Sequence, residues 1–298
     1  MDFLRYLESI RTPFLTVFFR FWTLFGEETL IFAIICLLYW CVDKKLAYKI
    51  AFTMFISGMF VQNLKISFRI ERPWIRDPNF KPVGDAMTTA TGYSFPSGHT
   101  QGAASFFGTL ALWLKKAQYV IPCFAVIVMV ALSRMYLGVH TPADVIVGMV
   151  LTIITAVICS YIFDRITNDL AVAIFFAAMS LFTVILSLTL MNSGHIDAPH
   201  AADCFKLAGT GFGAAVGWYI ERRYINFDTH ERNVFIQTIK LAVGLIIAVA
   251  LKSGLKPIVS DFTRYFITVL WILAIYPWGM RGMRSLLKKL RKTSEKNN

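Results

Sequence analysis

Three chemically active side chains, Arg134, His140 and Asp144, lie between two long apolar runs. A charge at the centre of a membrane helix costs roughly 2.5–3.5 kcal/mol on insertion scales, so such residues usually mark a functional site. Arginine binds phosphate through two parallel N–H groups, and a neutral histidine can attack phosphorus or carry protons. Asp144 follows His140 by one helical turn, so its carboxylate can orient the imidazole. The spacing predicts phosphoryl chemistry at the end of a membrane span.

The stretch Thr141-Pro-Ala-Asp144 also has a structural interpretation. It matches a capping box with proline at the first helical position. Asp144 can therefore cap its own helix, orient His140, or do both. Arg134 has no comparable alternative, because an unpaired arginine at the end of a span usually seeks an anion.

A second cluster, Tyr93-Ser-Phe-Pro96-Ser97-Gly98-His99-Thr100-Gln101, opens another apolar run. Ser97 has the residue type of a helix N-cap, and Gly98 lets the backbone approach a ligand closely. The first turn of a helix presents unpaired N–H groups and a positive dipole end, which together favour an anion. His99 is placed there as a proton donor. The alternative interpretation is an ordinary capped helix start with an incidental histidine.

A third cluster holds Lys65, Arg72 and Pro73. Seven residues are about two helical turns, or roughly 10 Å, so both cations leave one face if the helix continues. Pro73 favours an end to the helix at Arg72. Two cations that converge on a helix end suit a phosphate. The alternative is a lysine and an arginine that extend to the membrane edge for solvation.

These clusters need elements that hold them at one membrane face. The chain has 298 residues, 56% of them hydrophobic, and several runs approach the ~20 residues that span a bilayer. The predicted fold class is all-α, a polytopic transmembrane helix bundle. The net charge of +12 lies in loops and the tail, which predicts a bilayer partner and no nucleic acid. The nine predicted spans are 28–43, 47–67, 99–114, 117–136, 142–163, 169–191, 203–220, 234–253 and 262–280.

Apolar residues recur every three or four positions near the N-terminus, which predicts an interfacial amphipathic helix with a kink at Pro13. Lysine and arginine gather in alternate loops and in the tail, so the positive-inside rule places the C-terminus in the cytosol and the N-terminus outside. The suspected site then faces the non-cytosolic side. A plasma membrane, which in a bacterium is the inner membrane, is favoured over the endoplasmic reticulum. The predicted regions are 1–27 (interfacial helix), 28–165 (catalytic core), 166–280 (accessory spans) and 281–298 (basic cytosolic tail).

The order Lys-x6-Arg-Pro, Pro-Ser-Gly-His and Ser-Arg-x5-His-x3-Asp resembles the signature of the type 2 phosphatidic acid phosphatase family. The resemblance covers about residues 28–165. The nine predicted spans are similar to the arrangement of sphingosine-phosphate phosphatases and glucose-6-phosphatase, unlike the six-span members of the family. The matching positions are Lys65, Arg72, Pro73, Pro96, Ser97, Gly98, His99, Ser133, Arg134, His140 and Asp144.

The resemblance implies a role for each matched polar residue. His140 would attack phosphorus and form a phosphohistidine, Asp144 would orient it, and His99 would protonate the leaving oxygen and then activate water. No metal or other cofactor is implied, because cations replace the metal. The residues implied in phosphate binding are Lys65, Arg72, Ser97, Gly98 and Arg134.

One further group of residues could bind a metal. His195, Asp197, His200 and Asp203 fall in and just after a predicted outer loop. Their types suit a metal ion, but Pro199 and the loop setting define no fixed ligand geometry. The alternatives are an exposed polar loop and a role in gating the substrate.

The leading hypothesis is an integral membrane phosphatase for a lipid phosphate or diphosphate. The candidates are prenyl diphosphates, phosphatidate-like lipids and sphingoid phosphates. The same residues would serve a phosphotransferase, and the span count keeps a soluble sugar phosphate open as the substrate. A lipid transporter or scramblase is the non-enzymatic alternative, although the chain shows none of the inverted repeats common in transporters. No feature predicts an oligomeric state.

Overall fold

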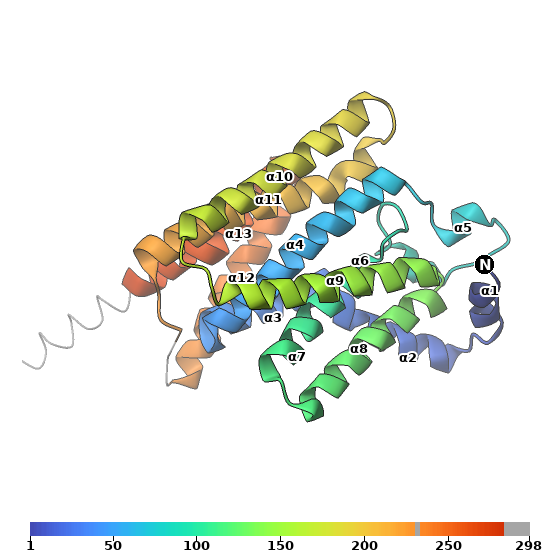
Figure 1. Cartoon of the computed structure of the whole chain (residues 1–298), viewed down its shortest axis with the longest axis horizontal. Coiled ribbons are helices and arrows are strands. Elements are labelled where there is room, and N and C mark those ends of the chain that lie inside the picture. The colour runs from blue at the N-terminus through green and yellow to red at the C-terminus, as the bar shows by residue number, and fades with distance from the viewer. Residues whose placement is uncertain (230–232, 283–298) are drawn as a thin grey trace, which may run out of the picture. The chain divides into compact units, whose positions relative to one another are not determined.

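The computed structural model describes residues 1–229 and 233–282, and every regular element within these ranges is helical (Figure 1). The all-α prediction is therefore confirmed. The α-helices are α1 (Asp2–Ser9), α2 (Pro13–Thr23), α3 (Glu28–Leu37), α4 (Lys44–Phe68), α5 (Pro73–Arg76), α6 (Gly98–Ala103), α7 (Thr109–Leu114), α8 (Ala117–Tyr136), α9 (Pro142–Phe163), α10 (Asp169–Asn192), α11 (Ala198–Ile220), α12 (Val234–Gly254) and α13 (Asp261–Leu270).

Short 3-10 or π-helical turns precede, follow or interrupt several of these helices. Nearly all of the predicted basic tail, from residue 283 on, lies outside the described residues. The turns are η1 (Leu24–Gly26), η2 (Leu38–Val42), η3 (Gly84–Met87), η4 (Ala104–Gly108), η5 (Glu221–Ile225) and η6 (Trp271–Ile275).

Five helices are long and apolar enough to cross a membrane. Two predicted spans have the same bounds as the helices that form, α8 and α9. A sixth crossing results if α2–η1 and α3–η2, which are bent by 48° at a short break, are one span. The chain is thus an integral multi-pass membrane protein. The five helices are Lys44–Arg76, Ala117–Tyr136, Pro142–Phe163, Asp169–Asn192 and Val234–Gly254.

The other four predicted spans are interrupted or less apolar in the described residues. Residues 99–114 form two short helices, α6 and α7, joined by the π-helical turn η4. A similar turn ends the helical run within 28–43, and another interrupts the run within 262–280. α11 covers 203–220 but carries Asp203 and Lys206 near its start, which lowers its hydropathy. The count of nine crossings therefore stays a prediction.

The amphipathic stretch 1–27 forms two helices, α1 and α2, which are separated next to the predicted kink site Pro13, and its interfacial placement stays a prediction. The chain breaks at residues 10–12, and Pro13 begins α2 instead of kinking one longer helix. The reason is local: Thr12 caps α2 by accepting a hydrogen bond from the Leu15 amide at 3.2 Å, and proline fits the first helical turn.

The chain divides into two compact units. The first contains Met1–Ile35, Lys45–Arg165 and Phe182–Phe205, and the second contains Cys36–Lys44, Ile166–Leu181 and the chain from Lys206 onward. The clusters from the opening sequence argument all belong to the first unit. Part of its core joins α1 to α8 and α9, through Leu4, Met135 and Val145. This packing holds the helix ends that carry the candidate site in fixed positions.

Polar side chains join α4 to the α6–η4–α7 run inside the first unit. Gln101 Nε2 donates to Ser57 Oγ at 2.8 Å, and Ser57 Oγ lies 3.0 Å from Ser105 Oγ. Thr109 Oγ1 donates to Thr53 Oγ1 at 3.1 Å. Between membrane helices, such hydrogen bonds stabilise association where hydrophobic burial gives little driving force. This polar seam fixes the helix that begins with His99 against the helix that carries Lys65.

Glycines at four-residue spacing let two helical runs of the second unit approach closely. Gly209, Gly213 and Gly217 of α11 face α13 and η6. A β-carbon at Gly213 would lie 2.8 Å from the Phe266 carbonyl oxygen and 2.9 Å from Val269 Cβ. Small residues at this spacing are a common packing surface between membrane helices.

We expect Gly213→Ala to destabilise the second unit, because its methyl group must separate backbones already in contact. Overpacking of this kind costs about 1–3 kcal/mol. Thermal unfolding in detergent measures the loss, with Gly279→Ala as the control, because a β-carbon at Gly279 meets no atom within 4 Å in the described chain. Equal melting temperatures for the two variants would contradict the packing argument.

Candidate active site

The first turn of α9 places the Asp144 carboxylate behind the His140 ring. Asp144 Oδ2 accepts hydrogen bonds from the Thr141 amide at 2.8 Å and from Ser94 Oγ at 2.6 Å. It also lies 3.5 Å from His140 Nδ1. The Thr141 hydroxyl in turn accepts from the Asp144 amide at 3.4 Å. The capping box is therefore confirmed, and the same carboxylate oxygen also faces His140.

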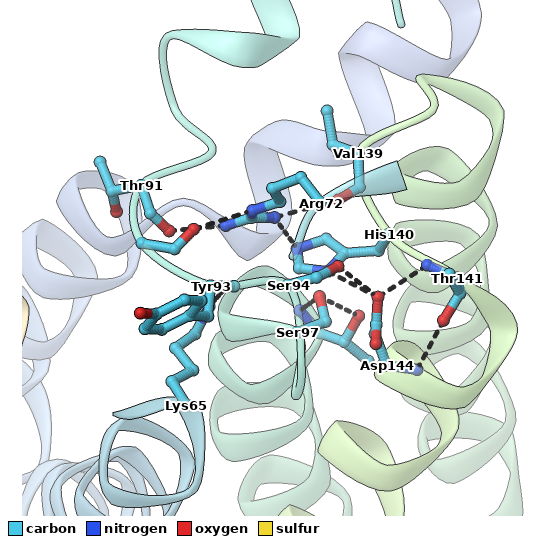
Figure 2. A network of polar contacts seen from close by, with 12 residues as sticks. Lys65, Arg72, Thr91, Tyr93, Ser94, Ser97, Val139, His140, Thr141 and Asp144 are labelled. Carbon is cyan, nitrogen blue, oxygen red and sulfur yellow. Dashed lines mark hydrogen bonds and ion pairs between the residues drawn. The ribbon is translucent and has the colours of Figure 1, made fainter. Parts of the chain in front are cut away.

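The contact between His140 and Arg72 defines the state of the imidazole. Arg72 Nη1 lies 3.0 Å from His140 Nε2 (Figure 2). A guanidinium can only donate, so Nε2 accepts and the ring proton belongs on Nδ1, facing Asp144. Burial and the nearby Arg72 charge hold the pKa of His140 well below its usual value. His140 is thus neutral, with a lone pair on Nε2.

Arg72 reaches the imidazole although the helix that carries Lys65 does not continue to it. α4 ends at Phe68, Arg69 has a positive φ of 53°, and Arg72 precedes the short helix α5. The expectation that one helical face presents both cations is therefore wrong. The left-handed backbone at Arg69 follows the end of α4, and Pro73 starts a new helix at its first position.

Both cations are buried and bind backbone carbonyl groups of the 91–93 segment (Figure 2). Lys65 Nζ donates to the Tyr93 carbonyl at 2.6 Å. Arg72 donates to the carbonyls of Gly92 at 3.1 Å and Thr91 at 2.6 Å, and to Val139 at 3.0 Å. Neutral carbonyls satisfy these donors without neutralising the positive charge, which stays available to an anion.

The Ser97–Gly98–His99 turn is held directly against α9. Ser97 caps α6 as predicted, because its hydroxyl accepts from the Thr100 amide at 3.4 Å. The Ser97 amide donates to the Asp144 carbonyl at 2.9 Å. A β-carbon at Gly148 would lie 2.9 Å from the Ser97 carbonyl oxygen. These contacts fix the α6 N-terminus, with the Gly98 amide in its first turn, beside the His140–Asp144 pair.

Two further groups in this region are buried without a partner among the described residues. They are His99 Nε2 and the Nε and Nη2 atoms of Arg134. His99 lies within electrostatic range of both Arg134 and His140. Buried donors and acceptors without partners are costly in a folded protein, and in native structures they often mark a site for a ligand.

The structure therefore brings together the residues named from the sequence. Hydrogen bonds and shared backbone segments connect five of them in Figure 2: Lys65, Arg72, Ser97, His140 and Asp144. His99 and Arg134 lie beside them and add side-chain nitrogens without a partner among the described residues. Such a cluster of cations and imidazoles at helix ends can bind a phosphoryl group, offset its charge and supply a nucleophile.

Sequence reasoning missed several residues that shape the cluster. Ser94, which donates to Asp144, lies inside the 93–101 cluster, but the sequence indicated no role for it. The carbonyls of 91–93 carry no side-chain signal at all. Thr23 belongs to no recognisable motif either. Its hydroxyl nevertheless accepts a hydrogen bond from Arg134 at 2.9 Å.

The polar residues around 195–203 contact the 91–93 segment. Asp203 accepts a hydrogen bond from Thr91 at 2.7 Å, the His200 ring stacks on Tyr93 at 4.3 Å, and Asp197 bonds to His200. Within the described ranges, no group of three or more histidine, cysteine, aspartate or glutamate side chains is placed to hold a metal ion. In this structure these residues tie the start of α11 to the segment that binds Lys65 and Arg72.

The fold and the site define the class of this protein: it is a multi-pass helical membrane protein with buried cations gathered at its helix ends. Two family models match the chain: the PAP2 superfamily over residues 46–168, and the transmembrane extension of PAP2 superfamily phosphatases over residues 205–287. The chain belongs to the PAP2 superfamily.

Two curated relatives share part of the chain. It is 27% identical over 171 residues to a probable sphingosine-1-phosphate phosphatase of Dictyostelium discoideum, covering 52% of this chain and 40% of the relative. It is 34% identical over 92 residues to phosphatidylglycerophosphatase B of Bacillus subtilis (strain 168), covering 27% of this chain and 43% of the relative. The matches thus span less than half the length of both relatives.

One solved structure is also similar. It is the crystal structure of a transmembrane PAP2 type phosphatidylglycerolphosphate phosphatase from Bacillus subtilis, with a TM-score of 0.47 and 22% sequence identity. The similarity covers 56% of this chain and 85% of that one.

We expect Ser94→Ala to destabilise the first unit by about 1–3 kcal/mol, because the buried Asp144 carboxylate loses a hydrogen-bond donor. Unfolding in detergent measures the change. Ser180→Ala is the matched control, since the buried Ser180 hydroxyl bonds only to the Phe176 carbonyl of its own helix, at 2.8 Å. A loss no larger than that of the control would show that Asp144 does not depend on Ser94.

Proposed function

We propose that this protein is a membrane lipid phosphatase that works through a phosphohistidine on His140. The observation that carries the proposal is the neutral His140, whose Nε2 lone pair faces Arg72 while Asp144 lies behind Nδ1. Phosphoryl transfer needs a nucleophile, a group that orients the nucleophile, and positive charge where the phosphate binds. Here these three parts are in contact.

In the first step, His140 Nε2 attacks phosphorus and the bond from phosphorus to the lipid oxygen breaks. His99, which takes up a proton when the phosphate charge is bound beside it, gives that proton to the oxygen, so the lipid leaves as an alcohol. Asp144 stabilises the positive charge that the phosphorylated imidazole carries at Nδ1. Lys65, Arg72 and Arg134 offset the charge on the phosphoryl oxygens.

In the second step, water attacks the phosphohistidine while His99 accepts one of its protons. The bond from phosphorus to Nε2 then breaks, inorganic phosphate leaves, and His99 is protonated again for the next cycle. The Gly98 amide and the capped start of α6 contribute a hydrogen bond and the positive end of a helix dipole. The Ser97 hydroxyl already accepts from Thr100, so its part in phosphate binding is to fix this turn and to offer its own proton.

The proposed substrate carries its phosphate on a hydrocarbon chain. By their names, the two curated relatives act on sphingosine-1-phosphate and phosphatidylglycerophosphate, and both compounds are lipid phosphates. These names favour sphingoid phosphates and phosphatidate-like lipids, with prenyl diphosphates as further candidates, over a soluble sugar phosphate.

We also propose the topology and regions that the loop charges indicate. The chain would cross the membrane nine times, with the N-terminus and active site on the non-cytosolic side and the C-terminus in the cytosol. Residues 28–165 form the catalytic core, and residues 166–280 form accessory spans. Cysteine-labelling from either side of sealed vesicles tests this orientation.

We expect purified protein to release phosphate from at least one member of a panel of sphingoid, phosphatidate-like and prenyl phosphates. His140→Ala should lower turnover by more than about a thousandfold, because it removes the nucleophile. Arg134→Ala should mainly weaken phosphate binding and raise KM by about a hundredfold, since it removes a paired, charged contact. Full turnover in His140→Ala, or no phosphate release from the whole panel, would overturn the proposal.

The lowered pKa of His140 predicts the acid limb of the pH profile. His140 must be neutral to attack, so turnover falls as the pH drops through its pKa. Burial and Arg72 lower that pKa, so we expect the limb below the ordinary histidine value of about 6.5. Initial rates across pH, with enzyme returned to neutral pH as a control for unfolding, measure it. A flat profile or a limb above 6.5 contradicts the assignment.

A further inference from the structure

We infer that Thr23, the last residue of α2, is a positioning residue for Arg134 and that the turn η1 after it holds Thr23 in place. This inference rests on the proposed function and adds to it. The PAP2 match begins at residue 46, so Thr23 lies outside the region that carries the family motifs. Its place in the site comes from contacts within the first unit.

Thr23 binds one edge of the Arg134 guanidinium and leaves the opposite edge, which carries Nε and Nη2, available. Arg134 Nη1 donates to Thr23 Oγ1 at 2.9 Å, and both side chains are buried. The opposite edge carries Nε and Nη2, whose N–H bonds run parallel and match two oxygens of a phosphate. Those two nitrogens are buried and have no partner among the described residues.

This division of donors explains why a hydroxyl is suited to position 23. An aspartate there would neutralise the arginine and compete with phosphate for its charge. A threonine hydroxyl accepts one hydrogen bond and leaves the net charge intact. Since a guanidinium is planar, fixing Nη1 and the side-chain stem also fixes the direction of the Nε–Nη2 edge.

The turn after Thr23 is seated tightly against two parts of the site. A β-carbon at Gly26 would lie 2.6 Å from the His99 carbonyl oxygen and 2.8 Å from Val130 Cγ1. A β-carbon at Gly102 would lie 3.0 Å from the Gly26 carbonyl oxygen. η1 thus contacts α6, which carries His99, and α8, which carries Arg134 in its last turn. Thr23 is held in place by this packing, so its hydroxyl is a fixed acceptor.

Thr23→Val tests the inference, because valine keeps the shape of threonine and removes the acceptor. We expect inhibition by orthovanadate to weaken about tenfold and KM for the best lipid phosphate of the panel to rise by a similar factor, the usual effect of losing a hydrogen bond to a charged group. Thr23→Ser, which keeps the hydroxyl, should stay within about threefold of the parent.

Thr16→Val is the matched control. Thr16 lies two turns earlier on the same face of α2, and within the described residues its hydroxyl approaches the Tyr136 hydroxyl, at 3.5 Å. We expect normal kinetics and a melting temperature similar to that of Thr23→Val. If both variants lose activity equally, Thr23 acts through general packing and the inference is wrong.

A double-mutant cycle shows whether Thr23 acts through Arg134. In an Arg134→Ala background, adding Thr23→Val should change vanadate inhibition by less than about twofold, because the coupled contact is already absent. Independent, additive losses would contradict a positioning role. A parent protein that releases no phosphate defeats the proposed function instead. The thermal shift caused by vanadate then still compares Thr23→Val with the parent, and an unchanged shift defeats the inference separately.

Discussion

The placement of positive charge beside a neutral imidazole is the constraint on which the first unit depends. Arg72 and His140 can touch only while the histidine accepts, which requires a proton on Nδ1 and therefore a carboxylate behind it. Asp144 meets that requirement through the first turn of α9, where it also caps the helix. Helix capping and the protonation state of the His140 imidazole are thus set by one carboxylate, which Ser94 and the Thr141 amide hold in place.

The motifs, the all-helical class and the bounds of the long apolar helices could be predicted from the sequence. Periodicity and hydropathy specify α8 and α9 because each lies between clear polar boundaries. The interrupted helices could not be predicted as well, since the π-helical turn η4 depends on packing and on the polar seam around Ser105. The residue types at the site were enough to predict its chemistry. The course of the backbone between Lys65 and Arg72 could not be predicted, because it depends on the positive φ of Arg69, which no motif marks.

What sequence reasoning missed shares one physical property. Thr23, Ser94 and the carbonyls of residues 91–93 contribute ordinary hydrogen-bonding groups, which occur throughout any chain. Their importance comes only from their neighbours, which are brought close by tertiary structure. Charged residues are expensive in apolar surroundings and therefore conspicuous in a sequence. A hydroxyl or a carbonyl costs little to place and leaves no comparable mark.

The carbonyl contacts of Lys65 and Arg72 have a consequence for stability. Several positive charges are buried together, and dipoles solvate them without cancelling their mutual repulsion. An oxyanion bound beside these cations would reduce that repulsion. A phosphate bound as proposed would therefore act as a counter-ion of the fold as well as a substrate. Linkage then requires the folded chain to become more stable as the concentration of oxyanion rises.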